Sequence, residues 1–250
     1  MLTAVITGAS AGIGAAIARQ FAQSGYRLAL IARRKEKLED LRKELGSKNI
    51  HIFDLDVSSR SAVDKTFSAI EKEVGSIDIL VNNAGVALGL DRAQEANLDE
   101  WEQCIAVNIN GMIYCTHAVL PGMVRRNQGH IINLGSVAGR YPYPGGNVYC
   151  GTKAFVHQFS LSLRADLLGT QIRVTCIEPG LVGGTEFSVT RFRGDKEKAK
   201  KIYEGTDPLQ PEDIAKTIHF CVSLPRHVNI NAIELMPVGQ AFAPLAVRKT

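Results

Sequence analysis

The chain has 250 residues and a formal charge of +4, from 29 basic and 25 acidic side chains. Its composition, 45% hydrophobic and 22% charged, excludes a disordered, collagen-like or coiled-coil protein. The charge is too small and too evenly spread to indicate nucleic-acid binding, and no apolar run approaches the roughly 18 residues that a membrane-spanning helix needs. This length suits one compact domain better than two.

Short β-rich runs alternate with helical stretches along the whole chain, the pattern of βα units around a parallel sheet covered on both faces. We predict seven strands, at Leu2–Thr7, Arg27–Ile31, Asn49–Phe53, Ile77–Val81, His130–Leu134, Arg173–Ile177 and Ile230–Leu235. Helical periodicity or strong helix formers predict helices at Ala15–Gln23, Lys35–Leu45, Ser59–Val74, Leu98–Val124 and Val148–Leu168. The predicted fold class is α/β: a single doubly wound, Rossmann-like domain over residues 1–250 with a seven-stranded parallel sheet and helices on both faces.

The first predicted strand leads into a glycine-rich turn, Thr7-Gly8-Ala9-Ser10-Ala11-Gly12-Ile13-Gly14, and then into a helix. Glycines leave the backbone amides open to a diphosphate, and the N-terminus of the following helix favours its negative charge. Because the turn lies between a strand and a helix, a phosphate site is favoured over a tight turn without a ligand.

The second predicted strand ends at Ile31, where dinucleotide-binding folds that prefer NAD place an acidic residue against the ribose 2′-hydroxyl. Here Ala32-Arg33-Arg34 occupies that region. Guanidinium groups suit a 2′-phosphate because they donate bidentate, charge-assisted hydrogen bonds. The pair therefore favours NADP as the cofactor, the alternative being a solvated basic first turn of the next helix.

Ser136, Tyr149 and Lys153 form the sharpest constellation in the sequence. The serine follows the fifth predicted strand, and the tyrosine and lysine, four residues apart, share one face of a helix. Lowering the pKa of a phenol by ~2 units takes ~2.7 kcal/mol, and one ammonium ~5 Å away at an effective dielectric of ~20 supplies ~3.3 kcal/mol. We therefore expect the lysine to lower the tyrosine pKa without other help.

The segment from Gly180 to Asp207 is irregular: a glycine-rich turn precedes the charged piece Gly194–Lys201, and helix signals resume at Pro211. Long loops in compact domains often serve function. Two interpretations stay open for it, a solvated excursion and a mobile lid over a pocket.

The five cysteines form no CxxC pair and no ligand-spaced cluster with histidine, and the six histidines are dispersed. We therefore expect reduced thiols, structural histidines and no metal site. The chain enters its first strand at Leu2, where a secretory signal would have to lie, so we expect a cytoplasmic location.

Together these features resemble the short-chain dehydrogenase/reductase family over essentially the whole chain. Further matches are Asn82-Asn83-Ala84-Gly85, Asn108, Asp56-Val57 and Glu178-Pro179-Gly180. The resemblance implies that NADP-binding residues are Gly8, Ser10, Gly12, Ile13, Gly14, Arg33, Arg34, Asp56, Val57, Asn83, Ala84, Gly85, Tyr149, Lys153, Pro179, Gly180, Val182 and Thr185.

The resemblance also implies catalytic roles for four of these positions. Tyr149 would be the general acid or base, and Ser136 would orient and polarise the substrate carbonyl. Lys153 would bind the nicotinamide ribose and lower the tyrosine pKa, and Asn108 would bind a water in a proton relay. Hydride passes through the cofactor itself.

Within the family, Leu120–Met123, Pro144–Tyr149 and Glu178–Phe187 resemble the branch of NADP-dependent 3-hydroxy acid dehydrogenases. That branch is associated with serine, allo-threonine, 3-hydroxyisobutyrate or 3-hydroxypropionate as small-molecule substrates. A 3-oxoacyl-carrier-protein reductase or another carbonyl reductase stays open, because its fold and catalytic residues would look alike. A dinucleotide-sensing module without catalysis is a remoter alternative.

A 3-hydroxy acid brings a carboxylate, which needs a cationic partner in a dry pocket. Arg191, Arg193 and Arg140 are candidates by chain position, and we expect Arg191 or Arg193 to bind it. Family members commonly assemble as tetramers through helices such as Val148–Leu168, so the resemblance also implies a homotetramer.

Overall fold

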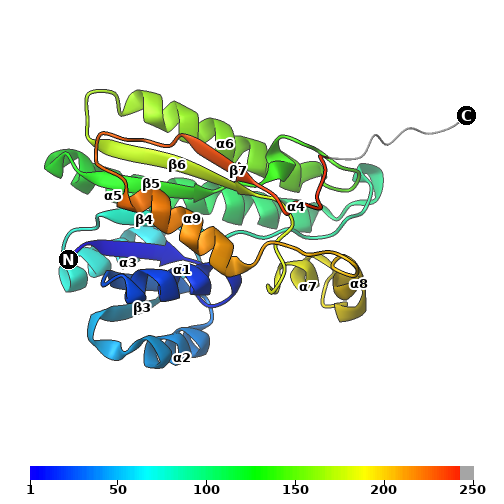
Figure 1. The fold of residues 1–250 in the computed structure, drawn as a ribbon, viewed down its shortest axis with the longest axis horizontal. Coiled ribbons are helices and arrows are strands. Elements are labelled where there is room, and N and C mark those ends of the chain that lie inside the picture. Colours follow the sequence, from blue (N-terminus) through cyan, green and yellow to red (C-terminus); the bar gives the residue numbers. More distant parts are fainter. Residues whose placement is uncertain (243–250) are drawn as a thin grey trace, which may run out of the picture.

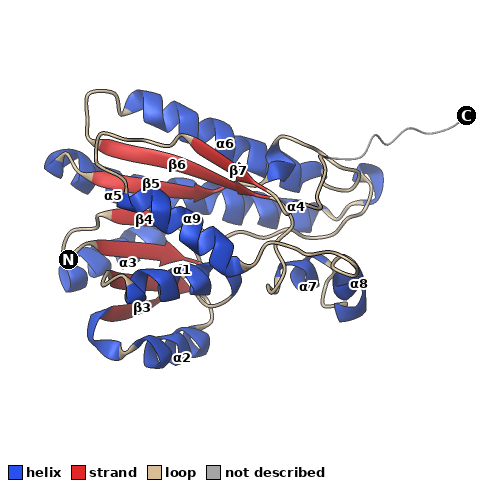
Figure 2. Ribbon diagram, in the orientation of Figure 1, coloured by secondary structure: helices blue, strands red, loops and turns tan. Residues whose placement is uncertain are grey.

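The computed structural model describes residues 1–242 of the chain. Its strands form one parallel sheet in the order β3-β2-β1-β4-β5-β6-β7 (Figure 2). They are β1 (Thr3–Thr7), β2 (Arg27–Ala32), β3 (Ile50–Asp54), β4 (Ile79–Asn82), β5 (Gly129–Leu134), β6 (Ile172–Pro179) and β7 (Ala232–Leu235). The predicted fold class and the seven strands are confirmed, with β6 longer and β7 shorter than predicted.

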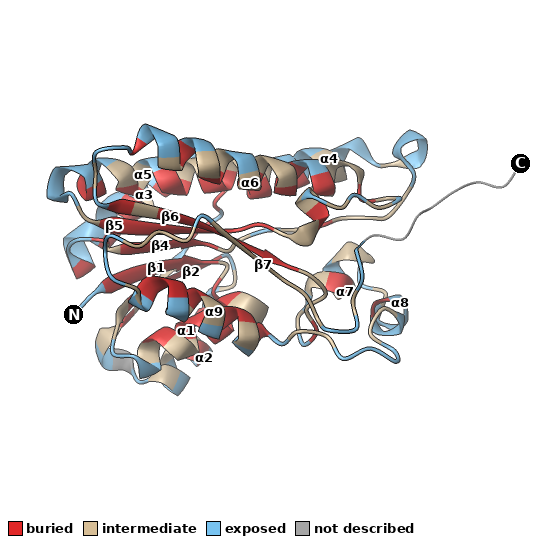
Figure 3. Ribbon diagram, turned by 45° about the horizontal axis from the view of Figure 1, so that its top comes forward, coloured by how far each residue is buried: buried red, intermediate tan, exposed pale blue. Residues whose placement is uncertain are grey.

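Helices cover both faces of the sheet, as Figure 3 shows. One layer contains α1 (Gly12–Gln23), α2 (Lys35–Leu45) and α9 (Pro211–Ser223), and the other contains α3 (Arg60–Val74), α5 (Met112–Arg126) and α6 (Asn147–Asp166). Each layer closes its own apolar core against the sheet, one around Phe21 and Leu38 and the other around Phe67 and Met123. The strands read as continuous apolar runs because both of their faces are buried.

The helix predicted from Leu98 is continuous but has an irregular middle. It consists of α4 (Leu98–Ile105), a π-helical segment η3 (Ala106–Gly111) that contains Asn108, and α5. Among the described residues, Leu98–Arg126 is one helix long and apolar enough to cross a membrane by length and composition alone. Its apolar face packs on the sheet through Val119 and Met123, which is the ordinary position of a core helix.

The strand order reverses direction at β1, whose neighbours are β2 on one side and β4 on the other. In open parallel sheets, ligands bind in the crevice at the carboxyl ends of strands at this switch point. The Thr7 hydroxyl joins the two loops there, since Oγ1 accepts hydrogen bonds from the backbone N–H groups of Asn83 and Ala84, each at 3.0 Å. The sheet therefore fixes the position of the predicted glycine-rich turn.

The segment predicted to be irregular contains two short helices, α7 (Phe187–Arg191) and α8 (Lys196–Lys201), beyond the carboxyl edge of the sheet (Figure 1). It contacts the loop after β4, where the Gly89 N–H donates to the Arg191 carbonyl at 3.0 Å. A capping box of Gln210 and Asp213, with Pro211 in the first turn, then starts α9. The segment thus lies across the mouth of the switch-point crevice, where a lid would lie.

Candidate active site

A cavity of about 530 Å³ runs along the carboxyl edge of the sheet. The structure brings most of the predicted site residues to its wall. These are Gly8, Ser10, Gly12, Ile13, Arg33, Arg34, Asp56, Val57, Asn83, Ala84, Gly85, Ser136, Tyr149, Lys153, Pro179, Gly180, Val182, Thr185 and Arg191. Gly14, Asn108 and Arg193 are the predicted site residues that do not line it. We call the part near Ser10, Arg33 and Arg34 the outer end and the part near Ser136, Tyr149 and Lys153 the inner end.

The glycine-rich turn opens its backbone toward the cavity. Gly8 and Gly12 have φ values of +66° and +52°, a region that side chains disfavour. The N-terminus of α1 has no side-chain cap and no acidic residue in its first turn, so its amides remain suited to an anion. Gly14 serves packing instead, because a Cβ there would collide with the Gly8 carbonyl.

At the outer end, the two predicted arginines lie where β2 ends. Arg34 donates to the Ser10 hydroxyl at 3.2 Å and forms an ion pair with Glu186 at 2.8 Å. Burial raises the Asp56 pKa, but hydrogen bonds from Ser58 and the charge of Arg33 together lower it by more. The net pKa therefore lies below its usual value. The outer end of the cavity therefore has two arginines and an ionised carboxylate at its wall, which suit the phosphate and the nucleoside of a phosphorylated nucleoside.

At the inner end, α6 presents Tyr149 and Lys153 on one face, as the four-residue spacing predicts. The Lys153 ammonium lies 5.9 Å from the tyrosine ring centroid and donates to the Leu134 carbonyl at 2.7 Å. Ser136 follows β5, where its Oγ donates to the Pro179 carbonyl at 3.3 Å. The three side chains therefore meet at the carboxyl edge of the sheet, two from α6 and one from the turn after β5.

The charge balance at the phenol differs from the sequence-based expectation. Burial raises the Tyr149 pKa, and the charge of Arg191 and a hydrogen bond from Ser136 oppose that rise without reversing it. Lys153 is itself buried, which lowers its pKa to about 8. Desolvation is the physical reason: it disfavours the charged form of both groups. The lysine by itself does not lower the tyrosine pKa in this structure.

Arg191 is the arginine that reaches the inner end. Its guanidinium carbon lies 4.8 Å from the Tyr149 ring centroid and 4.9 Å from that of Phe187, and Nη2 donates to the Tyr143 hydroxyl at 2.8 Å. Its Nε is buried and has no hydrogen-bond partner among the described residues. Because Arg191 lines the cavity beside Tyr149, its guanidinium group is suited to an anion that enters the cavity.

The other two candidate arginines are engaged elsewhere. Arg193 is exposed and forms ion pairs with Asp91 and Glu100, outside the cavity wall. Arg140 forms an ion pair with the buried carboxylate of Glu178 at 2.9 Å. Of the two arginines that the sequence left undecided, Arg193 is therefore excluded by position, since its charge is already neutralised at the surface.

Comparison with known proteins agrees with this geometry. Residues 2–196 match the model of the short chain dehydrogenase family. The chain belongs to the short-chain dehydrogenase family. The Salmonella typhi protein named "NADP-dependent 3-hydroxy acid dehydrogenase YdfG" is 54% identical over 98% of this chain and 99% of its own.

Two further proteins support the predicted branch. The Rhizobium radiobacter protein named "Serine 3-dehydrogenase" is 46% identical over 98% of this chain and 97% of its own. A solved structure, described as the closed form of serine dehydrogenase complexed with NADP+, is 53% identical, covers 100% of both chains and has a TM-score of 0.97. The resemblance to the NADP-dependent 3-hydroxy acid dehydrogenase branch of the short-chain dehydrogenases is therefore confirmed.

In this short-chain dehydrogenase both polar atoms of the Asn108 side chain form hydrogen bonds within the protein. Its Oδ1 accepts from the Val86 N–H at 2.8 Å, and Nδ2 donates to the Val86 carbonyl at 2.8 Å and to Thr152 Oγ1 at 3.0 Å. Thr152 lies on α6 between Tyr149 and Lys153. The asparagine thereby joins the loop after β4 to the helix that carries those two side chains.

Several wall residues of this short-chain dehydrogenase were not predicted as site residues from the sequence. Tyr143, Phe187, Tyr203 and Gln240 line the cavity. Gln240 comes from the segment after β7, and its Oε1 accepts from the Leu181 N–H at 2.8 Å. No local spacing relates these residues to the motifs, because segments distant in sequence bring them to the cavity.

Proposed function

We propose that this chain is an NADP-dependent dehydrogenase that transfers hydride between NADP(H) and C3 of small 3-hydroxy acids, with serine as the leading substrate. The observation that carries this proposal is the position of Arg191. Arg191 lines the same cavity as Ser136, Tyr149 and Lys153, with its guanidinium carbon 4.8 Å from the Tyr149 ring centroid, so a carboxylate and a hydroxyl of one short molecule have complementary groups side by side. The names of the similar proteins support the same activity.

The residues at the cavity wall fit NADP. Gly12 and Ile13 present backbone amides to a diphosphate, Arg33 and Arg34 suit a 2′-phosphate, and Pro179 borders the inner end. No carboxylate follows β2 at Arg33 and Arg34, so the acceptor that favours NAD is missing there. We propose the remaining predicted positions at the wall as contacts of the same cofactor. Gly14 instead supports the turn.

When bound, NADP supplies the hydride acceptor for alcohol oxidation. The chain's own residues handle the proton and the charges. Tyr149 Oη takes the proton of the C3 hydroxyl, and Ser136 Oγ donates a hydrogen bond to the oxygen as it becomes a carbonyl. Lys153 adds positive charge beside the phenol, and Arg191 orients the acid through its carboxylate. In the reverse direction the neutral tyrosine donates its proton.

A substrate panel followed by absorbance at the reduced-nicotinamide band tests the proposal. We expect turnover of serine, allo-threonine and 3-hydroxyisobutyrate with NADP, and at least tenfold lower kcat/KM with NAD. An acetoacetyl thioester should be a poor substrate, because it lacks the free carboxylate that Arg191 would bind. Turnover of the thioester alone would establish a 3-oxoacyl reductase instead. NADPH binding without turnover of any carbonyl compound would establish a sensing module.

We also propose that the whole chain acts as one catalytic domain and works as a cytoplasmic homotetramer. The five cysteines are free and buried, which suits a reducing compartment. Phe155 and Phe159 stack on α6 with ring centroids 5.7 Å apart and are only partly buried, so this helix retains apolar surface for a second copy. Light scattering at micromolar concentration tests the assembly, and a monomeric mass would contradict it.

A further inference from the structure

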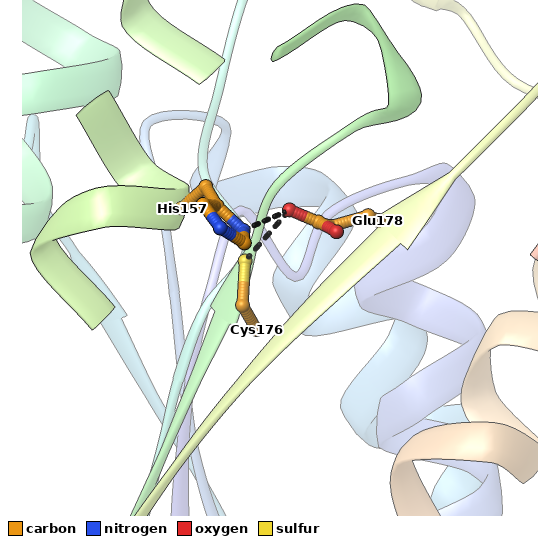
Figure 4. A group of neighbouring side chains, drawn as sticks. All are labelled: His157, Cys176 and Glu178. Atoms are coloured by element: carbon orange, nitrogen blue, oxygen red, sulfur yellow. Dashed lines mark hydrogen bonds and ion pairs between the residues drawn. The ribbon is translucent and has the colours of Figure 1, made fainter. Parts of the chain in front are cut away.

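His157, Cys176 and Glu178 form a cluster that joins α6 to β6 (Figure 4). None of the three lines the cavity. The Glu178 carboxylate is fully buried, yet it carries two basic partners. Its Oε1 lies 2.6 Å from His157 Nδ1, and its Oε2 accepts from Arg140 Nε at 2.9 Å. Cys176 Sγ lies 3.8 Å from the same Oε1. The sequence gives no hint of this cluster, because its members and Arg140 come from three separate elements.

The ligand types of His157, Cys176 and Glu178 also match those of a metal site, with ligand atoms all within 4.8 Å of one another. Two features make an ion-pair centre the better interpretation. Arg140 already binds one carboxylate oxygen, and its positive charge would repel a cation. His157 Nδ1 already lies 2.6 Å from the other carboxylate oxygen, so both oxygens of Glu178 have protein partners.

Each basic partner of Glu178 lies on an element that also carries a proposed catalytic residue. Arg140 ends the short turn η4 (Val137–Gly139), which Ser136 begins by accepting a hydrogen bond from the Ala138 N–H at 3.1 Å. His157 lies one helical turn after Lys153 on α6. Glu178 itself directly precedes Pro179, whose carbonyl accepts from the Ser136 hydroxyl. One carboxylate thus connects the serine turn, the tyrosine helix and the wall of the inner end.

The backbone around this cluster is closely packed, so small backbone shifts could not compensate for the loss of its ion pairs. A Cβ on Gly139 would lie 2.7 to 2.8 Å from backbone atoms of Lys153 and Ala154. A Cβ on Gly135 would lie 3.0 Å from Glu178 Cγ. The serine turn therefore touches α6 and β6 directly, and a change in the direction of Arg140 would be transmitted to Ser136.

We infer that Glu178 is a positioning residue: through Arg140 and His157 it fixes the distance and angle between Ser136 and the face of α6 that carries Tyr149 and Lys153. A buried carboxylate is retained at a desolvation cost that its two basic partners offset, and such networks fix geometry more than they add stability. The inference rests on the proposed function, because the geometry in question is that of hydride transfer from a 3-hydroxy acid.

Arg140→Gln is the most direct test, because it removes one partner of Glu178 at a side chain that is 40% exposed. Arg42→Gln is a matched control, since that arginine is 39% exposed and also forms a 2.9 Å ion pair, with Glu39 on α2. We expect kcat for serine to fall about 10- to 100-fold in Arg140→Gln and to stay unchanged in the control. The Kd for NADPH, from fluorescence titration, should match that of the wild type, whereas the Tm should fall, because the buried Glu178 loses one of its two basic partners.

The isotope effect separates positioning from a general loss of structure. With serine deuterated at C3, the effect on kcat should rise in Arg140→Gln, because hydride transfer becomes slower relative to product release. Arg140→Lys should restore part of kcat. Glu178→Gln, which keeps the shape of the side chain and removes its charge, should show the same rise in the isotope effect on kcat.

Three results would overturn the inference. Kinetics of Arg140→Gln equal to those of the Arg42→Gln control would show that the ion pair does not act on Ser136. A fall in kcat matched by equal losses of NADPH binding and Tm, with an unchanged isotope effect, would show a merely structural role. Failure of the wild-type protein to oxidise any 3-hydroxy acid would overturn the proposed function first and this inference with it.

Discussion

The charged groups at the outer end of the cavity lie near solvent, whereas those at the inner end are enclosed by protein. Arg34 and Glu186, which form an ion pair at the outer end, have side chains that are 40% and 50% exposed. At the inner end Lys153 is 8% exposed. Water and salt screen the first pair, so its contribution to stability is small. Burial instead shifts the proton equilibria of the inner groups, raising the Tyr149 pKa and lowering the Lys153 pKa to about 8.

The largest difference between the two ends should appear in Tyr149→Phe. We expect kcat to fall about 10³-fold while the Kd for NADPH stays nearly unchanged, because the proton acceptor is lost and the outer end is intact. Steady-state kinetics and fluorescence titration measure the two quantities. A variant that keeps its activity would mean that the proton passes through another group.

The pH profile of the wild type should also identify Tyr149 as the proton acceptor. Because the Tyr149 pKa is raised, the phenolate needed for oxidation becomes populated only as the pH increases. We therefore expect kcat/KM for serine oxidation to rise with pH from 7 to 9, and that for the reverse reduction to stay level over this range, because the phenol remains protonated. An oxidation rate that declines from pH 7 to pH 9 would contradict this assignment of the base.

A smaller effect should distinguish the two arginines of the segment from Gly180 to Asp207. Arg191→Met should lower kcat/KM for serine about 100-fold, because a charge-assisted contact to the carboxylate is lost. Arg193→Met should change it little, since that side chain forms exposed ion pairs with Asp91 and Glu100. Steady-state kinetics of the two variants measure this difference. Equal effects of the two substitutions, or none, would remove Arg191 as the carboxylate partner.

At the outer end, Arg34→Ala should reduce the preference for NADP over NAD about tenfold, with the exposed neighbour Lys35→Ala as its control. The effect should shrink at high ionic strength, because the phosphate contact lies near solvent. The ratio of kcat/KM for the two cofactors, measured at low and high salt, checks both statements. A preference that survives in Arg34→Ala would place recognition of the 2′-phosphate elsewhere.

The smallest effect concerns stability away from the cavity. His130 is buried, its Nε2 lies 2.8 Å from the Thr175 hydroxyl, and burial lowers its pKa to about 3. Below pH 6.5 the unfolded chain binds this proton and the folded chain does not, so stability falls as the pH decreases. At pH 5.5 we expect a loss of about 1 kcal/mol in the free energy of unfolding.

Denaturant unfolding at pH 7.5 and 5.5 measures that loss. His130→Gln should make it smaller, whatever the overall stability of the variant, because no proton is then bound at this position. The exposed His227→Gln should leave it unchanged. Identical pH dependence in wild type and His130→Gln would assign the acid sensitivity to other groups.

The fold was predictable because its signals are local or repeat along the chain. Buried parallel strands appear as apolar runs such as Thr3–Thr7, and stretches with helical periodicity alternate with them along most of the chain. The short helices α7 and α8 and the π-helical segment at Asn108 were not predicted. They depend on packing against loops distant in sequence, which no local period reports.

The position of Tyr149 and Lys153 on one face of α6 was predictable for the same reason, since residues four apart on a helix must share a face. The choice among Arg140, Arg191 and Arg193 was not. Each is an arginine in a polar stretch, and only the folded chain shows which one faces Tyr149 and which ones meet carboxylates. The balance of the tyrosine pKa also depended on burial, which the spacing of Tyr149 and Lys153 does not contain.

By itself, the sequence determined the order of strands and helices, the open backbone of the glycine-rich turn, and the presence of a phenol, an ammonium and a hydroxyl at the carboxyl edge of a parallel sheet. These follow from covalent spacing and from the periods of helix and strand. The tertiary structure decided which charges are screened and which are buried. It assigned Arg191 to the cavity and joined Arg140, His157 and Glu178 behind it, because dielectric environment and long-range contacts exist only once the layers have packed.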